Sequence, residues 1–175
     1  MIRNNLSLGW SSAAPLWHTF TKTEGFSPAG ATVSYQLRLN RHFSLGPDIQ
    51  WQLLEGTSTI KDNPNSISTS MHAWHERRFL SAAVTTHYYF VKRDTMLPYV
   101  SASVGGMRVR ERRGVMVDTN DIESWHVLVA PEIGMYLLYG RIPVWLNTRL
   151  GIGIPTADVQ GEILLLLTLG VTVPH

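Results

Sequence analysis

The fold is decided by residues 161–174, GEILLLLTLGVTVP. From Ile163 to Val173 every second residue is apolar. The intervening row is polar or small at Glu162, Thr168 and Gly170. Side chains that alternate with a period of two belong to a β-strand, since a helix repeats every 3.6 residues. The apolar row spans roughly 35 Å at about 3.3 Å per residue, which suits a tilted strand crossing a bilayer core about 30 Å thick.

Seven further segments alternate in the same way. The segment 31–40 is the most regular, because Ala31, Val33, Tyr35, Leu37 and Leu39 alternate with polar residues without an error. We therefore predict an all-β fold, an eight-stranded antiparallel up-and-down transmembrane β-barrel formed by one domain over residues 1–175. The other predicted strands are 4–12, 43–54, 78–91, 97–110, 124–139 and 142–154.

The predicted connections alternate in length. Short turns are expected at 41–42, 92–94 and 140–141, and long loops at 13–29, 55–77 and 111–123, before a modest loop at 155–160. Short turns at one end and long loops at the other are typical of outer-membrane barrels. Within the strands, Pro47 predicts a bulge or a bend, because proline lacks the ladder donor, and the pair Gly105 and Gly106 predicts a bulge or a phase change.

Composition restricts the class of protein. The chain has 175 residues, a formal net charge of +2 and no cysteine. This length fits one domain, and the small charge does not favour nucleic acid as a partner. The first ten residues have neither the apolar core nor the cleavage site of a signal peptide. Either the protein is not exported or a signal has been removed from this sequence, and the strand pattern leads us to expect the second.

The second row of each strand indicates which face is outside. It holds mostly Gly, Ser, Thr, Ala, Asn and Gln, which suit the inside of a narrow eight-stranded barrel. The apolar rows should therefore face lipid. Aromatic residues lie towards the ends of these rows, as in interfacial girdles. They are Trp10, Tyr35, Trp51, Tyr88, Phe90, Trp125 and Tyr139.

The step from Tyr88-Tyr89-Phe90 to LPYVSASVGG at 97–106 adds a family resemblance. With the eight-strand pattern, it resembles the small outer-membrane β-barrels of Gram-negative bacteria, of the OmpA/OmpX type and of the barrel domains common in Bacteroidetes. The resemblance implies the bacterial outer membrane as location, with lipopolysaccharide and other envelope proteins as partners and no cofactor. One departure is the end of the sequence, which is Pro174-His175 where such barrels usually carry an aromatic residue.

Charged residues in the inward rows form the first candidate site. They are Arg38, Asp48, Glu132, Arg149 and Glu162. Because desolvated charges must be paired, we expect Arg38 and Arg149 to bridge to Asp48 and Glu132 across the lumen. A structural plug is the favoured interpretation, ahead of a gated ion path and of a catalytic pair of carboxylates.

Four arginines form the second candidate site, Arg108, Arg110, Arg112 and Arg113, at the point where a strand leaves the membrane. Guanidinium groups match phosphate geometry, so these residues are candidates for contacts with lipopolysaccharide phosphates. A solvated loop rim is an equally weighted alternative.

Four histidines are candidates for metal binding or catalysis. His72 and His75 lie in a predicted loop without a third fixed ligand, so no metal site is predicted. His126 is followed by Leu128 and not by the serine of a lipid A deacylase, and His87 has hydroxyl neighbours but no evident acid. We therefore predict a non-enzymatic structural or partner-binding barrel of the envelope. A small ion or solute channel and, less favoured, a lipid A-modifying hydrolase are the alternatives.

Overall fold

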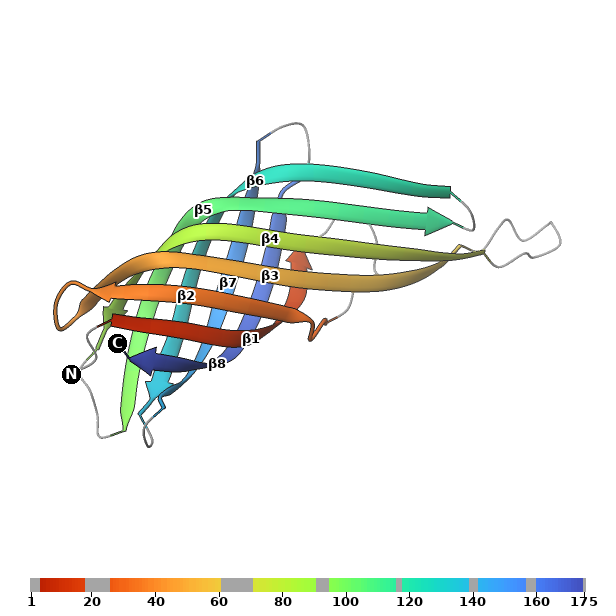
Figure 1. Ribbon diagram of the computed structural model, residues 1–175. Coiled ribbons are helices and arrows are strands. Elements are labelled where there is room, and N and C mark those ends of the chain that lie inside the picture. Colours follow the sequence, from red (N-terminus) through yellow and green to blue (C-terminus); the bar gives the residue numbers. More distant parts are fainter. Residues whose placement is uncertain are drawn as a thin grey trace.

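Eight antiparallel strands close into a barrel (Figure 1). The computed structural model describes residues 4–17, 26–60, 71–90, 95–115, 118–138, 142–156 and 160–174. The strands are β1 (Asn4–Trp17), β2 (Gly30–Arg38), β3 (Phe43–Ile60), β4 (Met71–Tyr89), β5 (Met96–Val115), β6 (Asp118–Leu137), β7 (Val144–Pro155) and β8 (Glu162–Pro174).

Each strand pairs with its neighbour in sequence, and β1 pairs with β8 to close the sheet. The closing register places Leu6 opposite Val173, and Trp10 opposite Leu169. The predicted fold class is confirmed. Among the described residues there is no helix of the length and apolarity that a membrane crossing needs.

The apolar rows face outward, as predicted. On β8, Leu169 is 51% exposed, whereas Thr168 beside it is buried. Outward aromatic side chains lie towards both ends of the rows, with Trp10, Trp51 and Trp125 at one end and Tyr88 and Phe90 at the other. Of the other two predicted aromatics, Tyr35 is half-buried, and Tyr139 lies outside the described residues.

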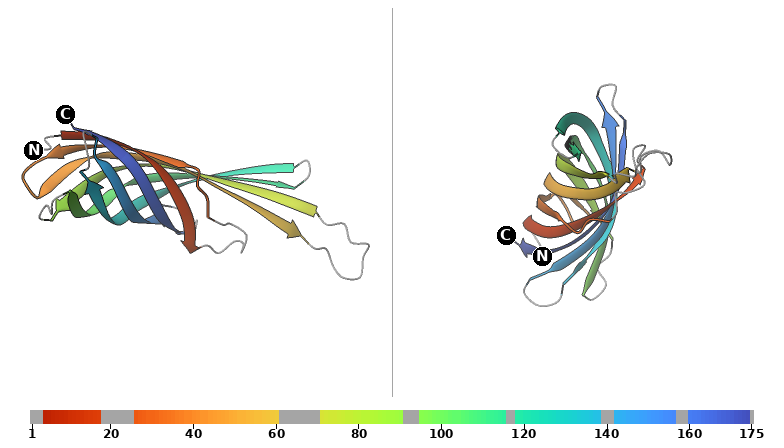
Figure 2. Two further views of the ribbon diagram at one scale, coloured as in Figure 1. Left: turned by 90° about the horizontal axis from the view of Figure 1, so that it is seen from below. Right: turned by 90° about the vertical axis from the view of Figure 1, so that its right-hand side faces the viewer.

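Four strands extend well beyond the barrel. The β3–β4 ladder continues to Ile60 opposite Met71, and the β5–β6 ladder continues to Val115 opposite Asp118. The flanking ladders stop earlier, because β2 leaves β3 at Gln52 and β7 leaves β6 at His126. Strands β3 to β6 therefore form a sheet that protrudes from one end of the barrel (Figures 1 and 2).

The long loops predicted at 55–77 and 111–123 are therefore wrong for most of their length. Only residues 116–117 separate β5 from β6. The predicted strands end where their apolar rows end, although a strand in water needs no apolar outer row. Outward charges of opposite sign continue across β4, β5 and β6, and such cross-strand pairs stabilise a solvated sheet.

Pro47 makes no bulge, and Gly105 and Gly106 make neither a bulge nor a phase change, so these parts of the prediction are wrong. Pairing is missing between β2 and β3 next to Pro47, but the register on either side is unchanged. The ladders of β5 run through both glycines without a shift. A shift occurs instead in β1, between Pro15 and Trp17.

The lumen is filled by side chains in layers. An aromatic layer near the short turns contains Tyr89, Leu97, Tyr99, Tyr136 and Trp145. An apolar layer farther along includes Phe79, Met107, Leu128, Leu164 and Leu166. A void of about 20 Å³ beside this layer has room for about one water molecule. The expectation of a small, polar lumen therefore misses an apolar layer.

Candidate functional site

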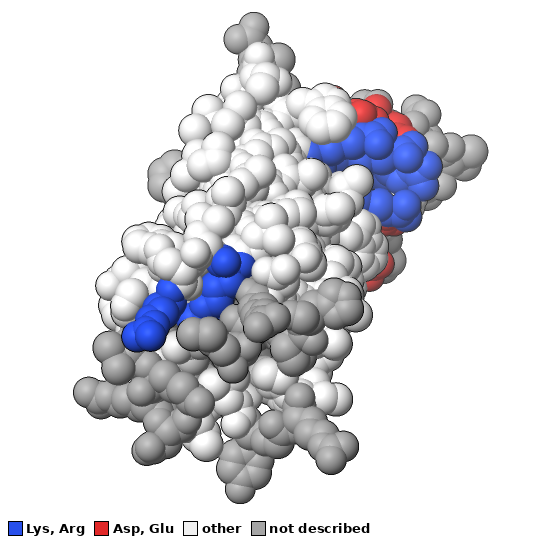
Figure 3. Space-filling model, turned by 60° about the vertical axis from the view of Figure 1, so that its left-hand side comes forward, with Lys and Arg blue, Asp and Glu red and all other residues white. Residues whose placement is uncertain are grey.

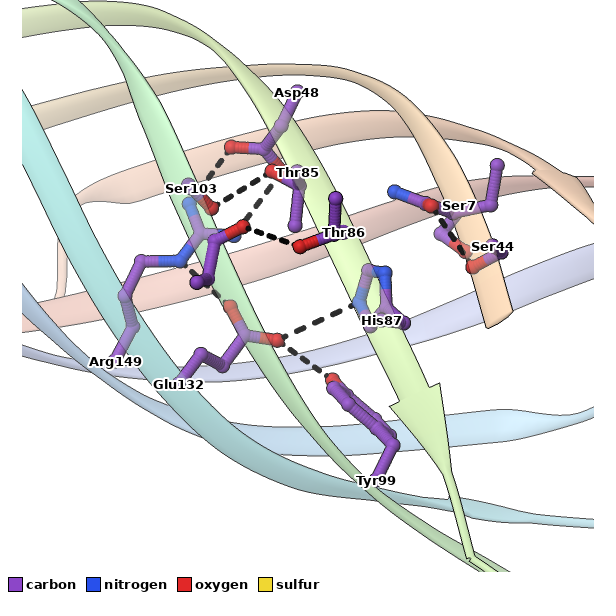
Figure 4. A network of polar contacts seen from close by, with 12 residues as sticks. Ser7, Ser44, Asp48, Thr85, Thr86, His87, Tyr99, Ser103, Glu132 and Arg149 are labelled. Atoms are coloured by element: carbon purple, nitrogen blue, oxygen red, sulfur yellow. Dashed lines mark hydrogen bonds and ion pairs between the residues drawn. The ribbon is translucent and has the colours of Figure 1, made fainter. Parts of the chain in front are cut away.

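Arg149 on β7 joins two carboxylates inside the lumen (Figure 4). Its Nε donates to Oε2 of Glu132 at 2.6 Å, and its Nη1 donates to Oδ1 of Asp48 at 2.7 Å. Glu132 is the direct ladder neighbour of Arg149, whereas Asp48 lies on β3, which is not adjacent to β7. The side chain of Arg149 therefore crosses the lumen. All three residues are buried, so their charges are compensated chiefly by each other.

Neighbouring side chains complete this network. Tyr99 donates its hydroxyl hydrogen to Oε1 of Glu132 at 2.8 Å, and Nη1 of Arg149 also donates to Oε1 of Gln50 at 3.2 Å. Nε2 of His87 lies 3.9 Å from Oε1 of Glu132, and its ring contacts Tyr99 edge-on. A buried charge cluster with this many partners is held in one arrangement.

Arg38 does not belong to the lumen network, which corrects the sequence prediction. Its Nε and Nη2 donate to the backbone carbonyls of Asn40 and Arg41 at 3.1 and 2.6 Å, and its guanidinium lies over the ring of Tyr89. Arg38 is the last residue of β2. It therefore lies at the turn, too near the barrel end to reach the carboxylates.

A second polar cluster lies beyond the apolar layer. Arg77 on β4 pairs with Glu162 on β8, and its Nε lies 3.8 Å from Oε2 of Glu111 on β5. Nδ1 of His75 is 4.0 Å from Oε1 of the same Glu111. The residue pattern predicts Glu162 as an inward charge but not Arg77, because the predicted strand begins one residue later, at Arg78.

The histidines do not form a catalytic triad within the described residues. Oγ of Ser124 and Nε2 of His126 lie 2.9 Å apart, but no carboxylate is paired with Nδ1 of His126. Near His87, the hydroxyls of Thr85 and Ser103 bond to each other at 2.7 Å. A hydrolase of the Ser-His-Asp type requires an acid that orients the imidazole.

The described residues also contain no group of three ligating side chains suited to a metal ion. Of the two loop histidines, His75 contacts Glu111, and the nearby Glu76 pairs with Arg78. The side chain of His72 lies outside the described residues.

The outward face of the protruding sheet carries a ladder of ion pairs, visible as one basic area bordered by acidic side chains (Figure 3). Arg108 on β5 makes two bonds to Glu123 on β6, at 2.7 and 2.6 Å. Arg110 binds Asp121 through Nε and Nη2, and Nε of Arg112 is 3.5 Å from the same carboxylate. The candidate arginines thus already have carboxylate partners. The side chain of Arg113 lies outside the described residues.

Arg78 on β4 belongs to the same surface, although it is not among the four arginines predicted from the sequence. It pairs with Glu76 and lies directly opposite Arg110 in the β4–β5 ladder. The pairing register of β4 and β5 brings Arg78 and Arg110 together, and the sequence alone does not reveal this register. A surface hollow of about 170 Å³ lies here, lined by Trp51, Arg78, Phe79, Leu80, Arg108 and Arg110.

These exposed ion pairs lower the pKa of their carboxyl groups. Hydrogen bonds from Arg108 lower the pKa of Glu123, and hydrogen bonds from Arg110 lower the pKa of Asp121. Both carboxyl groups are therefore charged at neutral pH. The four groups are about 40% exposed, so their attraction is screened by water and salt.

Comparison with known proteins identifies the type of barrel. Neisserial surface protein A covers 98% of this chain and 96% of its own, with a TM-score of 0.56 and 14% identity. The attachment invasion locus protein Ail of Yersinia pestis covers 97% and 96%, with a TM-score of 0.51 and 7% identity. The N-terminal β-barrel domain of Pseudomonas aeruginosa OprF covers 98% of both chains, with a TM-score of 0.50 and 11% identity.

The fold is that of the small outer-membrane β-barrels. At these identities the likeness shows the fold alone. No protein-family model and no curated protein sequence matches the chain. The residue roles of this outer-membrane β-barrel therefore have to be argued from its own contacts.

Proposed function

We propose that this protein is a non-enzymatic component of the bacterial outer membrane that binds envelope partners with its outer wall and protruding sheet. The observation that carries the proposal is the filled lumen, in which Arg149 bridges two walls and an apolar layer lies beside it. A filled lumen leaves the outer surface as the place for interactions. The protruding sheet offers such a surface, with ordered charges above a lipid-facing wall.

Two features weigh against the alternative functions. A channel requires a continuous wet path, and the void beside the apolar layer holds only about one water molecule. A hydrolase requires an oriented histidine, and His126 has no carboxylate partner among the described residues. One structural neighbour, Ail, has been crystallised with the heparin analogue sucrose octasulfate, which supports anion binding by a barrel of this fold.

The test combines two measurements on one preparation from the native envelope in mild detergent. Mass spectrometry of the purified protein should find an envelope protein or lipopolysaccharide retained in a fixed ratio. Planar-bilayer recording should show no current above that of the detergent blank. Discrete current steps, or a bare and monodisperse barrel, would contradict the proposal.

A further inference from the structure

The arginines of the protruding sheet begin where the apolar wall ends. On β4 the outward row changes from Leu80 to Arg78, and on β5 it changes from Val104 to Arg108. From Phe90 to Leu80 a strand advances about 33 Å, or about 25 Å of height at a tilt of about 40°. This height equals the usual apolar band of an outer-membrane barrel, about 25 Å. Arg78 and Arg108 therefore lie at the level of the outer-leaflet headgroups.

The hollow between β4 and β5 is lined by guanidinium groups. None of its six lining residues is acidic, and three of them are arginines. Arg78 and Arg110 face each other directly across the ladder, an arrangement in which like charges repel. Their carboxylate partners contact them from outside the hollow, since Asp121 is on β6, Glu76 is on the strand of Arg78, and neither lines the hollow. An anion in the hollow would relieve this repulsion.

Hydrogen-bond donors remain for such an anion. Arg108 and Arg110 use Nε and Nη2 for their carboxylates, and Nη1 of each makes no hydrogen bond to another described residue. A guanidinium group binds phosphate through two parallel N–H donors, so both its shape and its charge match the phosphate group. The hollow thus offers several charged donors from adjacent strands.

The other wall of the hollow is apolar. Trp51 and Leu80 line it, and both are large side chains exposed to the outside. Below them the outward rows of β3 and β4 stay apolar through Ile49 and Val84. An occupant that matches both walls has a phosphate at one end and acyl chains at the other.

We propose that this hollow binds a phosphate monoester of an outer-leaflet glycolipid of the lipid A type. The inference deepens the proposed function and rests on it, because it requires the outer membrane. A phosphate monoester carries more negative charge than the diester of a glycerophospholipid, and three arginines favour the more highly charged group. Asp121 and Glu123 compete with the phosphate for the arginines and yield to it, because exposed ion pairs are weak.

The first experiment measures the binding of diphosphoryl lipid A to the full chain in detergent micelles by native mass spectrometry. The variant R78Q/R108Q/R110Q should bind lipid A at least about tenfold more weakly than wild type, since charge-assisted hydrogen bonds are lost. The control R38Q/R41Q removes two arginines at the opposite end of the barrel and should bind like wild type. Circular dichroism and the gel shift of unheated protein verify folding of each variant.

The second experiment removes the competing carboxylates. The variant D121N/E123Q should bind lipid A more tightly than wild type, because Arg108 and Arg110 are then released. A surface on which the ion pairs only stiffen the sheet would give the opposite result or none. Three further probes test which part of the ligand is recognised: dephosphorylated lipid A, phosphatidylglycerol and inorganic phosphate. Each should bind more weakly than diphosphoryl lipid A.

The outcomes separate the site from the function. Equal binding of lipid A by wild type and by the triple arginine variant overturns the site while leaving a partner-binding role intact. Equal binding of phosphatidylglycerol and lipid A overturns the choice of a phosphate monoester. Current steps across a bilayer, with lipid A bound as expected, would overturn the proposed function and leave the site standing.

Discussion

The arginine in the lumen and the arginines on the outer wall make the same bond in opposite surroundings. Arg149 is 4% exposed and is held by Asp48 and Glu132 from two walls of the barrel. Arg108 is paired as closely with Glu123, yet its side chain is 41% exposed. Burial therefore makes the first pair a fixed part of the fold, whereas water leaves the second pair open to exchange with a ligand.

The largest effect is expected from breaking the buried network. Arg149→Met should destabilise the barrel by about 3–5 kcal/mol, because Asp48 and Glu132 are left buried without their cation. Urea unfolding in micelles, followed by tryptophan fluorescence, measures the loss. Adding Asp48→Asn and Glu132→Gln to the same variant should restore much of the stability, and failure to do so would contradict the charge argument.

A smaller effect is expected in the apolar layer of the lumen. Leu166→Ala should cost about 3 kcal/mol, because a buried side chain is replaced by a cavity. Leu167→Ala is the matched control, since Leu167 lies next in the chain but is 43% exposed on the outer face. Equal losses for the two variants in the same unfolding assay would show that the lumen layer is not packed as described.

The outer ion pairs should contribute little to stability. Arg108→Gln is expected to leave the urea midpoint unchanged within experimental error, because its partner Glu123 stays hydrated after the pair is broken. A shift as large as that of Arg149→Met would contradict the contrast between the two regions.

The smallest effect is a change in titration. The folded-state pKa of Glu123 is lowered by hydrogen bonds from Arg108, so the pair is present above the ordinary carboxyl pKa and is lost as pH falls through the lowered value. Arg108→Gln should raise the pKa of Glu123 towards the ordinary value, as measured by carbon-13 NMR of the carboxyl group. Arg41→Gln, at the other end of the barrel, should leave that pKa unchanged.

Residue alternation was sufficient to predict the barrel and its outward face. The period of two assigns Leu169 and Thr168 to opposite faces without knowledge of any neighbour. The same rule assigned Asp48, Glu132 and Arg149 to the lumen. The rule does not give the position of a residue along the barrel axis. The sequence therefore predicts Arg38 in the lumen network, although this residue lies at a turn.

Other features were hidden from sequence analysis for definite reasons. Leu164 and Leu166 stand within five consecutive apolar residues, where the inward and outward rows look alike. The protruding sheet has a charged outer row, so the apolar signal stopped before its strands did. Arg78 joins Arg110 only through the β4–β5 register, which is a property of the folded sheet.

The apolar layer around Phe79, Met107 and Leu166 has an electrical consequence. A small ion entering it would have to shed its hydration shell, at an idealised cost on the order of 20 kcal/mol in a medium of low dielectric constant. The charged clusters on either side of the layer cannot lower this barrier by much, since their charges are already committed to each other. We therefore expect the barrel interior to oppose the passage of ions as the surrounding hydrocarbon does, so that insertion of the protein should leave the electrical resistance of a membrane unchanged.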